Sequence, residues 1–177
     1  DLSWLNKKIN NKEVTTKIQD TIHITLDAVS SLRRINSELR PSLLDDLGLF
    51  PALEFQAKEF SKRYNVPCSL KVDVEEPEFD PKYDIAVFRI FQETLNNIAK
   101  HAEATEVKVE VTGDDEQFHL KVTDNGKGFD TSGKGKARSF GIMGMTERAM
   151  MMNGTLKVKS VLGKGTTMHL VVPVTSL

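Results

Sequence analysis

The spacing of apolar residues changes at Pro41, which predicts two parts of the chain with different architectures. Upstream of Pro41, apolar residues recur every three or four positions and form one narrow stripe on a long helix from about Val14. The stripe consists of Ile18, Ile22, Leu26, Val29, Leu32, Ile35 and Leu39. Pro41 ends this helix, because the residue before a proline disfavours the helical conformation. A narrow stripe with no sheet beside it must be buried on another helix.

A second, shorter helix is expected in residues 1–9, where Leu2, Leu5 and Ile9 share one face, and the two asparagines that follow predict a turn. Residues 1–40 are therefore interpreted as the end of a helical hairpin. Two copies of such a hairpin would complete their core as a four-helix bundle in a homodimer. A monomeric hairpin folded back on the rest of the chain is the alternative, and the stripe alone does not exclude it.

Downstream of Pro41 the pattern alternates between helices and strands, which predicts an α+β fold built as a two-layer α/β sandwich with a mostly antiparallel sheet. Helices are expected at 51–64, 84–102 and 141–153, and strands at 69–74, 107–112, 118–123, 156–160 and 166–172. We interpret 41–50 as a linker with turn chemistry and 51–177 as a second domain. The segment 131–139 is rich in glycine, serine and lysine and is predicted to be a mobile loop.

Composition excludes several classes of protein. The formal net charge is -1, so no general basic field favours nucleic acid or an acidic membrane surface, and direct nucleic-acid binding is not expected. Cys68 is the single cysteine, which excludes an intrachain disulfide and metal sites built on several thiolates. No apolar run approaches the ~18 residues of a membrane span. A cytoplasmic location is expected, and the start at Asp1, within a helical pattern, suggests a fragment of a longer protein.

Polar residues near the end of helix 84–102 form the first candidate site. Glu93 and Asn97 are four positions apart and therefore point to one side of the helix, and Lys100 follows three positions later. The amide oxygen of Asn97 suits a hard cation such as Mg²⁺, and Lys100 offers a charge to phosphates bound to that metal. A solvated polar face is the alternative, and it is favoured when this helix is considered alone.

The second candidate is the segment 124–128, with the sequence DNGKG, at the end of a predicted strand. The carboxylate of Asp124 can accept a hydrogen bond from an exocyclic amino group such as that of adenine, and glycines allow a ligand to approach closely. The alternative is a plain β-turn.

Two glycine-containing segments complete the set. Gly141 and Gly144 open a predicted helix, where exposed amides form an anion site, although a tight loop-to-helix turn gives the same pattern. Thr166 follows two glycines in the segment 163–167, where hydroxyls can hold a water against Asp124. The alternative for this segment is a simple hairpin.

The order and spacing of these four segments closely resemble the ATP-binding fold shared by gyrase, Hsp90, MutL and histidine kinases, the GHKL or Bergerat fold, over roughly residues 50–174. The resemblance implies ATP and Mg²⁺ as cofactors, with Asn97 as the Mg²⁺ ligand and Glu93 as the acidic group that orients a water or the metal. It implies that the loop 130–140 covers the nucleotide as a lid. The ATP-binding residues implied by it are Asn97, Lys100, His101, Asp124, Gly126, Gly128, Gly141, Gly144, Met145 and Thr166.

Two further strings resemble histidine kinases of the NarX and DesK type: ELRPSLLDDLGL at 38–49, and KHA at 100–102 together with GMTERA at 144–149. This resemblance implies transfer of the ATP γ-phosphoryl group to a histidine and then to an aspartate of a response regulator. Such kinases carry the phosphorylated histidine in a Glu-Leu-His-Asp-type box, and no such string is present. The box is expected upstream of Asp1, so the chain is predicted to bind Mg-ATP without phosphorylating itself.

The four histidines are interpreted as poor substitutes for that box. His23, His119 and His169 are most simply structural, and His101 either contacts phosphate or caps its helix. Two other functions stay open: a different ATP-binding protein of the same fold, such as an anti-sigma serine kinase or a gyrase-like ATPase, and a non-enzymatic dimer scaffold with a relic nucleotide site. The sequence leaves open whether the parent protein is anchored in a membrane.

Overall fold

The computed structural model describes residues 42–75, 80–130 and 140–174, together with positions 14, 17, 18, 20–22 and 25. The chain divides into two compact units, Asp1–Pro41 and Ser42–Leu177. In the first unit the described positions are helical, and the stripe members Ile18 and Ile22 are half-buried. The rest of the predicted hairpin lies outside the described residues. Among the described residues, no helix is both long and apolar enough to span a membrane.

The second unit contains a five-stranded sheet with the strand order β1-β2-β3-β5-β4. Its strands are β1 (Cys68–Asp73), β2 (Val107–Gly113), β3 (Gln117–Asp124), β4 (Thr155–Val161) and β5 (Gly165–Pro173). β1 pairs with β2 in parallel, and the other three pairs are antiparallel. The predicted, mostly antiparallel sheet is therefore present, and each predicted strand lies within about two residues of its observed bounds.

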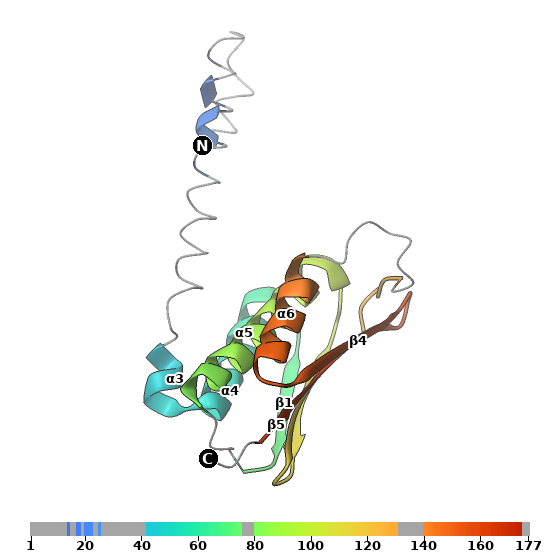
Figure 1. Ribbon diagram of the computed structural model, residues 1–177. Helices are drawn as coiled ribbons and strands as arrows, with labels where there is room; N and C mark the ends of the chain where they lie inside the picture. The colour runs from blue at the N-terminus through green and yellow to red at the C-terminus, as the bar shows by residue number, and fades with distance from the viewer. Residues whose placement is uncertain are drawn as a thin grey trace. The chain divides into compact units, whose positions relative to one another are not determined.

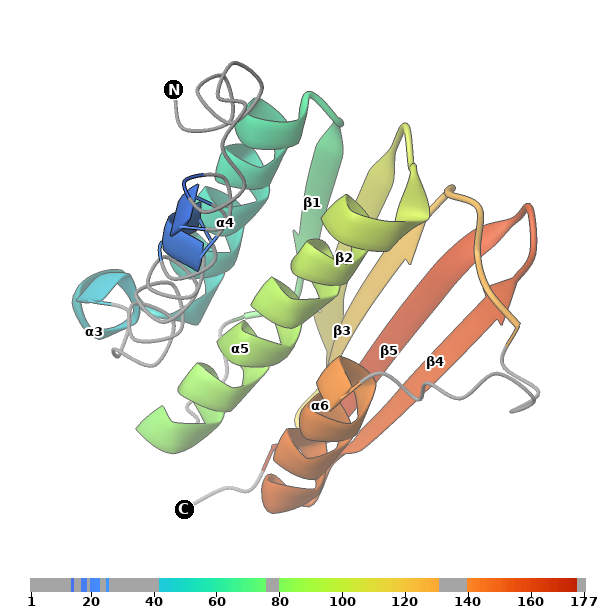
Figure 2. The same cartoon turned by 90° about the horizontal axis from the view of Figure 1, so that it is seen from above.

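The helices are α3 (Ser42–Leu47), α4 (Leu49–Tyr64), α5 (Pro81–Asn97), the π-helix η1 (Ile98–Ala102) and α6 (Phe140–Met151). Helices α4, α5 and α6 lie side by side over one face of the sheet, with α4 over β1 and α6 over β4 and β5 (Figures 1 and 2). Local chemistry explains where α5 begins. The Asp80 carboxylate accepts a hydrogen bond from the Lys82 N–H at 3.0 Å, and Pro81 occupies the first helical turn.

The core fills the space between the two layers. Alternate residues of each central strand face the helices, as the burial pattern of β2 shows at Val107, Val109 and Val111. Phe118, Leu120 and Val122 of β3 continue this apolar face, and Phe88, Phe91 and Leu95 of α5 are also buried. The predicted two-layer α/β sandwich is confirmed.

The segment 41–50, which the sequence analysis interprets as a linker, contains helical residues. Residues 42–47 form helix α3, and α4 begins at Leu49. Leu44 and Leu49 belong to the buried core, so this segment is part of the second unit. Gly48 allows the abrupt turn between the two helices, because its φ of 85° lies in a region that residues with a side chain rarely adopt.

Candidate functional site

A cavity of about 500 Å³ opens between the helical layer and the ends of β3 and β5. Its wall is mostly apolar and includes Ile98, Ala102, Val122, Met145 and Met168. Asp124 contributes a carboxylate to this lining and Thr166 contributes a hydroxyl. An apolar cavity with a few polar groups suits a flat heterocycle that presents one or two hydrogen-bonding edges.

The carboxylate of Asp124 is nearly inaccessible, with a relative exposure of 3%. It belongs to the last residue of β3, directly opposite Thr166 of β5. Burial raises the pKa of Asp124, and hydrogen bonds from the backbone N–H groups of Gly126 and Thr166 oppose that rise. The Gly126 N–H donates to Oδ1 at 2.8 Å. The carboxylate is therefore held rigidly and remains a strong acceptor for a donor that enters the cavity.

The loop that follows Asp124 is fastened to the turn after η1. The Asn125 side-chain oxygen accepts hydrogen bonds from the N–H groups of Thr105 at 2.9 Å and Glu106 at 3.0 Å. The Lys127 N–H donates to the Ala102 carbonyl at 2.7 Å. A Cβ atom at Gly126 would lie 2.8 Å from the carbonyl carbon of Ala102, so only glycine allows this close approach of the two backbones.

The other side of the loop contacts the β4–β5 hairpin. Gly128 has a φ of 59°, and a Cβ atom there would collide with the backbone of Val161. The Ser160 Oγ accepts a hydrogen bond from the Phe129 N–H at 2.8 Å and lies 2.9 Å from the Thr166 Oγ1. Ser160 therefore links the loop to the hydroxyl that lines the cavity.

The end of α5 meets the start of α6 at a second polar cluster. A Cβ atom at Gly141 would collide with the Glu93 carboxylate and would lie 3.5 Å from the Asn97 Nδ2. Both side chains therefore face the first turn of α6, as their four-residue spacing predicts. This cluster brings the side-chain amide of Asn97 and the carboxylate of Glu93 next to the N-terminal amides of a helix, which favour anions.

The π-helix η1 changes which residues of the KHA string reach the cavity. Hydrogen bonds in a π-helix run from residue i to i+5, so each residue advances by a smaller angle than in an α-helix. His101, four residues after Asn97, lines the cavity, whereas Lys100 is exposed and does not. The cavity lining therefore includes His101 and not Lys100. The placement of Lys100 on the side of Asn97 assumes an α-helix through Ala102 and stays a prediction.

The predicted site residues fall into three groups. Six of them line the cavity: Asn97, His101, Asp124, Gly128, Met145 and Thr166. Glu93, Gly126 and Gly141 lie directly behind that lining, against Asn97 or Asp124. Lys100 and Gly144 are outside it, and a Cβ atom at Gly144 would lie 3.2 Å from the Arg148 side chain. The predicted lid lies mostly in residues 131–139, outside the described residues.

Several lining residues were not predicted. Val122 and Met168 point into the cavity because each lies two positions from a predicted site residue on the same strand, a signal that alternation along β3 and β5 contains. Thr94 is buried beside them, and its hydroxyl donates to the Ile90 carbonyl at 2.8 Å and contacts the Met145 sulfur at 3.5 Å. Nothing in the local sequence marks Thr94, because its position depends on how α5 and α6 pack.

The chain is similar in sequence to known proteins. Residues 83–176 match the family described as histidine kinase-, DNA gyrase B-, and HSP90-like ATPase. The chain is 36% identical over 164 residues to the signal transduction histidine-protein kinase/phosphatase DegS of Brevibacillus brevis. That alignment covers 93% of this chain and 42% of the relative, so the chain spans less than half of the relative's length.

Solved structures share the fold. The histidine kinase domain of the Erythrobacter litoralis EL346 blue-light activated histidine kinase has a TM-score of 0.67 and 16% identity, over 98% of this chain and 90% of that one. The mycobacterial sensor histidine kinase MprB has a TM-score of 0.57 and 17% identity, over 72% of this chain and 95% of that one.

Proposed function

Because the chain belongs to the family of histidine kinase-, DNA gyrase B- and HSP90-like ATPases, we propose that its cavity binds Mg-ATP as the catalytic region of a sensor histidine kinase. The observation that carries this proposal is the buried Asp124 carboxylate in an apolar cavity whose opposite wall bears Asn97. An adenine ring needs this combination of an apolar slot and a fixed acceptor for its amino group.

In this proposal the purine end of the site lies at the end of β3. Asp124 accepts a hydrogen bond from the adenine amino group, and the wall residues Ile98, Met145 and Met168 contact the faces of the ring. Thr166 adds a hydroxyl beside the carboxylate, which suits a water shared between them. The two glycines of the loop, Gly126 and Gly128, keep the backbone close enough to hold this geometry.

The phosphate end lies where α5 meets α6. Asn97 supplies an amide oxygen for Mg²⁺, and Glu93 orients a metal-bound water or the reacting group. Gly141 brings the N-terminal amides of α6 to the phosphates, with Gly144 and His101 at its margins. Among the described residues no cluster of three or more His, Cys, Asp or Glu is present, which suits a cation held by few protein oxygens together with phosphate and water. Bound Mg-ATP supplies the transferable phosphoryl group and the charge neutralisation that this transfer needs.

The proposed reaction transfers the γ-phosphoryl group to a histidine on a dimerisation helix and then to an aspartate of a response regulator. In this proposal, residues 1–40 belong to that helical hairpin, which pairs with a second copy in a homodimer. The histidine box is not found in the sequence, so the proposal places the acceptor on a part of the hairpin that this chain does not contain. The chain positions the nucleotide, and positioning accounts for most of the catalysis in phosphoryl transfer.

A phosphotransfer assay tests the proposal. The chain is incubated with γ-labelled ATP, Mg²⁺ and a separate helical hairpin that carries the histidine box of a related kinase. We expect label on the hairpin that is lost in acid and kept in base, as phosphohistidine requires, and no label on the chain itself. An acid-stable label on a serine would instead favour a serine kinase of the same fold, and failure to bind any nucleotide by calorimetry would refute the proposed site.

A further inference from the structure

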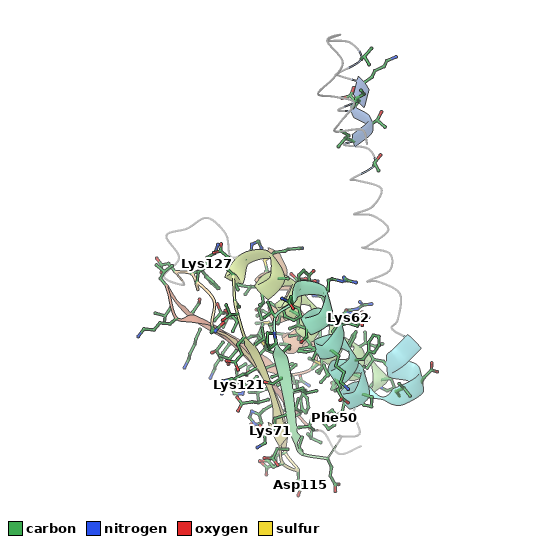
Figure 3. The ribbon with its side chains drawn as sticks, turned by 180° about the vertical axis from the view of Figure 1, so that it is seen from behind. Phe50, Lys62, Lys71, Asp115, Lys121 and Lys127 are labelled. Carbon is green, nitrogen blue, oxygen red and sulfur yellow. The ribbon has the colours of Figure 1, made fainter. Side chains whose placement is uncertain are left out.

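The open face of the sheet, opposite the helices and the cavity, carries a row of charged residues across all five strands. The strand register places Lys71, Glu110, Lys121, His169 and Lys157 side by side, one from each strand in the order of the sheet. Figure 3 shows Lys71 and Lys121 along the sheet, with Lys62 on helix α4. Adjacent strands are about 4.8 Å apart, so neighbours in this row interact electrostatically.

The two halves of this face differ in charge balance. On β1, β2 and β3 each lysine has an acidic partner: Lys71 pairs with Asp73 at 3.1 Å, Lys108 with Glu106 at 3.4 Å and Lys121 with Glu110 at 2.7 Å. Strands β4 and β5 contain no aspartate or glutamate. Within the part of the chain that the structure describes, their exposed lysines, Lys157 and Lys159, form no ion pair, which leaves positive charge on this half.

Two histidines, His119 of β3 and His169 of β5, lie on the same face as these lysines. The His119 Nδ1 lies 3.2 Å from the His169 Nε2, and the rings stack with centroids 5.4 Å apart. One ring nitrogen donates and the other accepts, so the two imidazole rings form a hydrogen-bonded pair. We name the set of Lys157, Lys159, His119 and His169 the β4–β5 patch.

The charges around His169 determine how a bound anion would affect its protonation. Burial lowers the pKa of His169, and so do the positive charges that face it, which belong to His119, Lys121, Lys157 and Lys159. Two acidic groups lie near the histidines. Glu110 forms an ion pair with Lys121, and Asp114 interacts with His119 and accepts hydrogen bonds from the turn after β2. A bound anion adds negative charge here, so it favours protonation of His169, and protonation in turn strengthens anion binding.

We propose that the β4–β5 patch binds an extended acidic segment of a partner protein. Lys157 and Lys159 are alternate residues of the edge strand β4, so their charges are spread along a line on the open face of the sheet. A single phosphate would instead need donors that converge on one point. Val161, two residues beyond Lys159 on the same strand, is 56% exposed and adds an apolar contact at the end of this line. Val158 lines the nucleotide cavity from the opposite face, so both surfaces are usable at once.

Fluorescence anisotropy with a short labelled peptide of alternating glutamate and serine tests this proposal on the full chain. The variant Lys157→Glu/Lys159→Glu should bind the peptide about tenfold more weakly, because two attractive charges become repulsive. The matched control, Lys71→Glu/Lys108→Glu, makes the same charge change on the balanced half of the same face and should change affinity by less than about twofold. Melting curves by circular dichroism establish that both variants are folded. If Lys157→Glu/Lys159→Glu is not folded, Lys157→Gln/Lys159→Gln replaces it, with an expected loss of peptide affinity of about threefold.

The pH dependence gives an independent readout. Peptide affinity of the unmodified chain should rise as the pH falls from about 8 to about 6, and this rise should disappear in His169→Gln. Equal losses in the two lysine variants, or no peptide binding at low salt, would overturn the proposal. Binding to vesicles that contain phosphatidylglycerol, without binding to the peptide, would overturn it in favour of a lipid surface.

Discussion

Replacement of Asp124 by asparagine separates the proposed contact with adenine from the stability of the fold. Asparagine has nearly the same shape and keeps an oxygen that can accept the hydrogen bond from the Gly126 N–H. It removes the negative charge, however, and presents an amino group on its other side. The change therefore weakens the hydrogen bond to the nucleotide without opening a cavity in the protein.

The expected loss of affinity follows from the type of hydrogen bond. A hydrogen bond to a charged acceptor contributes about 1.5–3 kcal/mol, which corresponds to about a 10- to 150-fold weaker binding of ATP. Isothermal titration calorimetry with ATP and Mg²⁺ measures this loss directly. Because Asp124 is only 3% exposed, solvent does not screen the contact, and the upper half of the range is favoured.

The same substitution should not reduce stability at neutral pH. Burial raises the pKa of Asp124 in the folded chain above its ordinary value of 3.8, so the ionised carboxylate opposes folding. The stability associated with this group is therefore greatest at low pH and is lost as the pH rises through the folded pKa. An asparagine side chain does not titrate. The Asp124→Asn variant should therefore have a higher free energy of unfolding than the unmodified chain at neutral pH, and this difference should shrink in acid.

Asp115 offers a control for the chemistry of the change. It lies in the exposed turn between β2 and β3, at the opposite end of the sheet from Lys127 and the DNGKG loop (Figure 3). Asp115→Asn should leave both ATP affinity and unfolding unchanged. If Asp124→Asn binds ATP as tightly as the unmodified chain, or destabilises it strongly at neutral pH, the reasoning about the buried carboxylate is refuted.

Three further substitutions test other parts of the site. Asn97→Ala should abolish the difference between the ATP affinities that calorimetry measures with Mg²⁺ and with EDTA, and it should leave the melting temperature unchanged. A difference that persists would contradict the role of Asn97 as a Mg²⁺ ligand. Gly141→Ala should displace the flexible Glu93 carboxylate, so the free energy of unfolding changes by less than about 1 kcal/mol while Mg-ATP affinity falls about tenfold. Gly126→Ala should lower the free energy of unfolding by about 1–3 kcal/mol in urea titrations, because its methyl group meets the rigid Ala102 backbone.

Gly163 gives the control for Gly126→Ala, because it combines a strained backbone with open space. Its φ is 74°, and a Cβ atom there would meet nothing within 4 Å. Gly163→Ala should therefore cost only the backbone strain, about 1 kcal/mol. A loss at Gly126 no larger than the loss at Gly163 would show that the close approach to Ala102 does not make Gly126 necessary.

The strands and the longer helices of the second unit were predictable because each has a strong periodic signal. The alternation in 107–112 and 118–123 identifies β2 and β3, and the spacing of Ile85, Phe88 and Phe91 identifies α5. The segment 42–50 was not predicted as helical, because its proline and glycine flank a helix of only 6 residues. Leu44 is held by tertiary packing, and local propensity does not report such packing.

Part of the polar lining of the candidate site was predictable, whereas Thr94, Lys127 and Asp130 were not predicted. Asp124, Asn97 and Thr166 share a cavity, as the order of their segments predicted. The π-helix was not predictable, since no short-range pattern distinguishes it from the last turn of an α-helix. Of the two residues Lys100 and His101, both predicted for the site, His101 lines the cavity and Lys100 does not. The roles of these residues toward ATP and Mg²⁺ remain predictions that the substitutions above test.

The π-helix also joins the two ends of the site mechanically. Its last carbonyl, on Ala102, accepts the Lys127 N–H at 2.7 Å, and its first residue follows Asn97 directly. Any displacement of the 125–128 loop by a purine must therefore either break this hydrogen bond or shift the 5 residues of η1. Under the proposed function, nucleotides with altered bases should accordingly change the affinity for the Mg²⁺ proposed at Asn97, even though no part of the base reaches it.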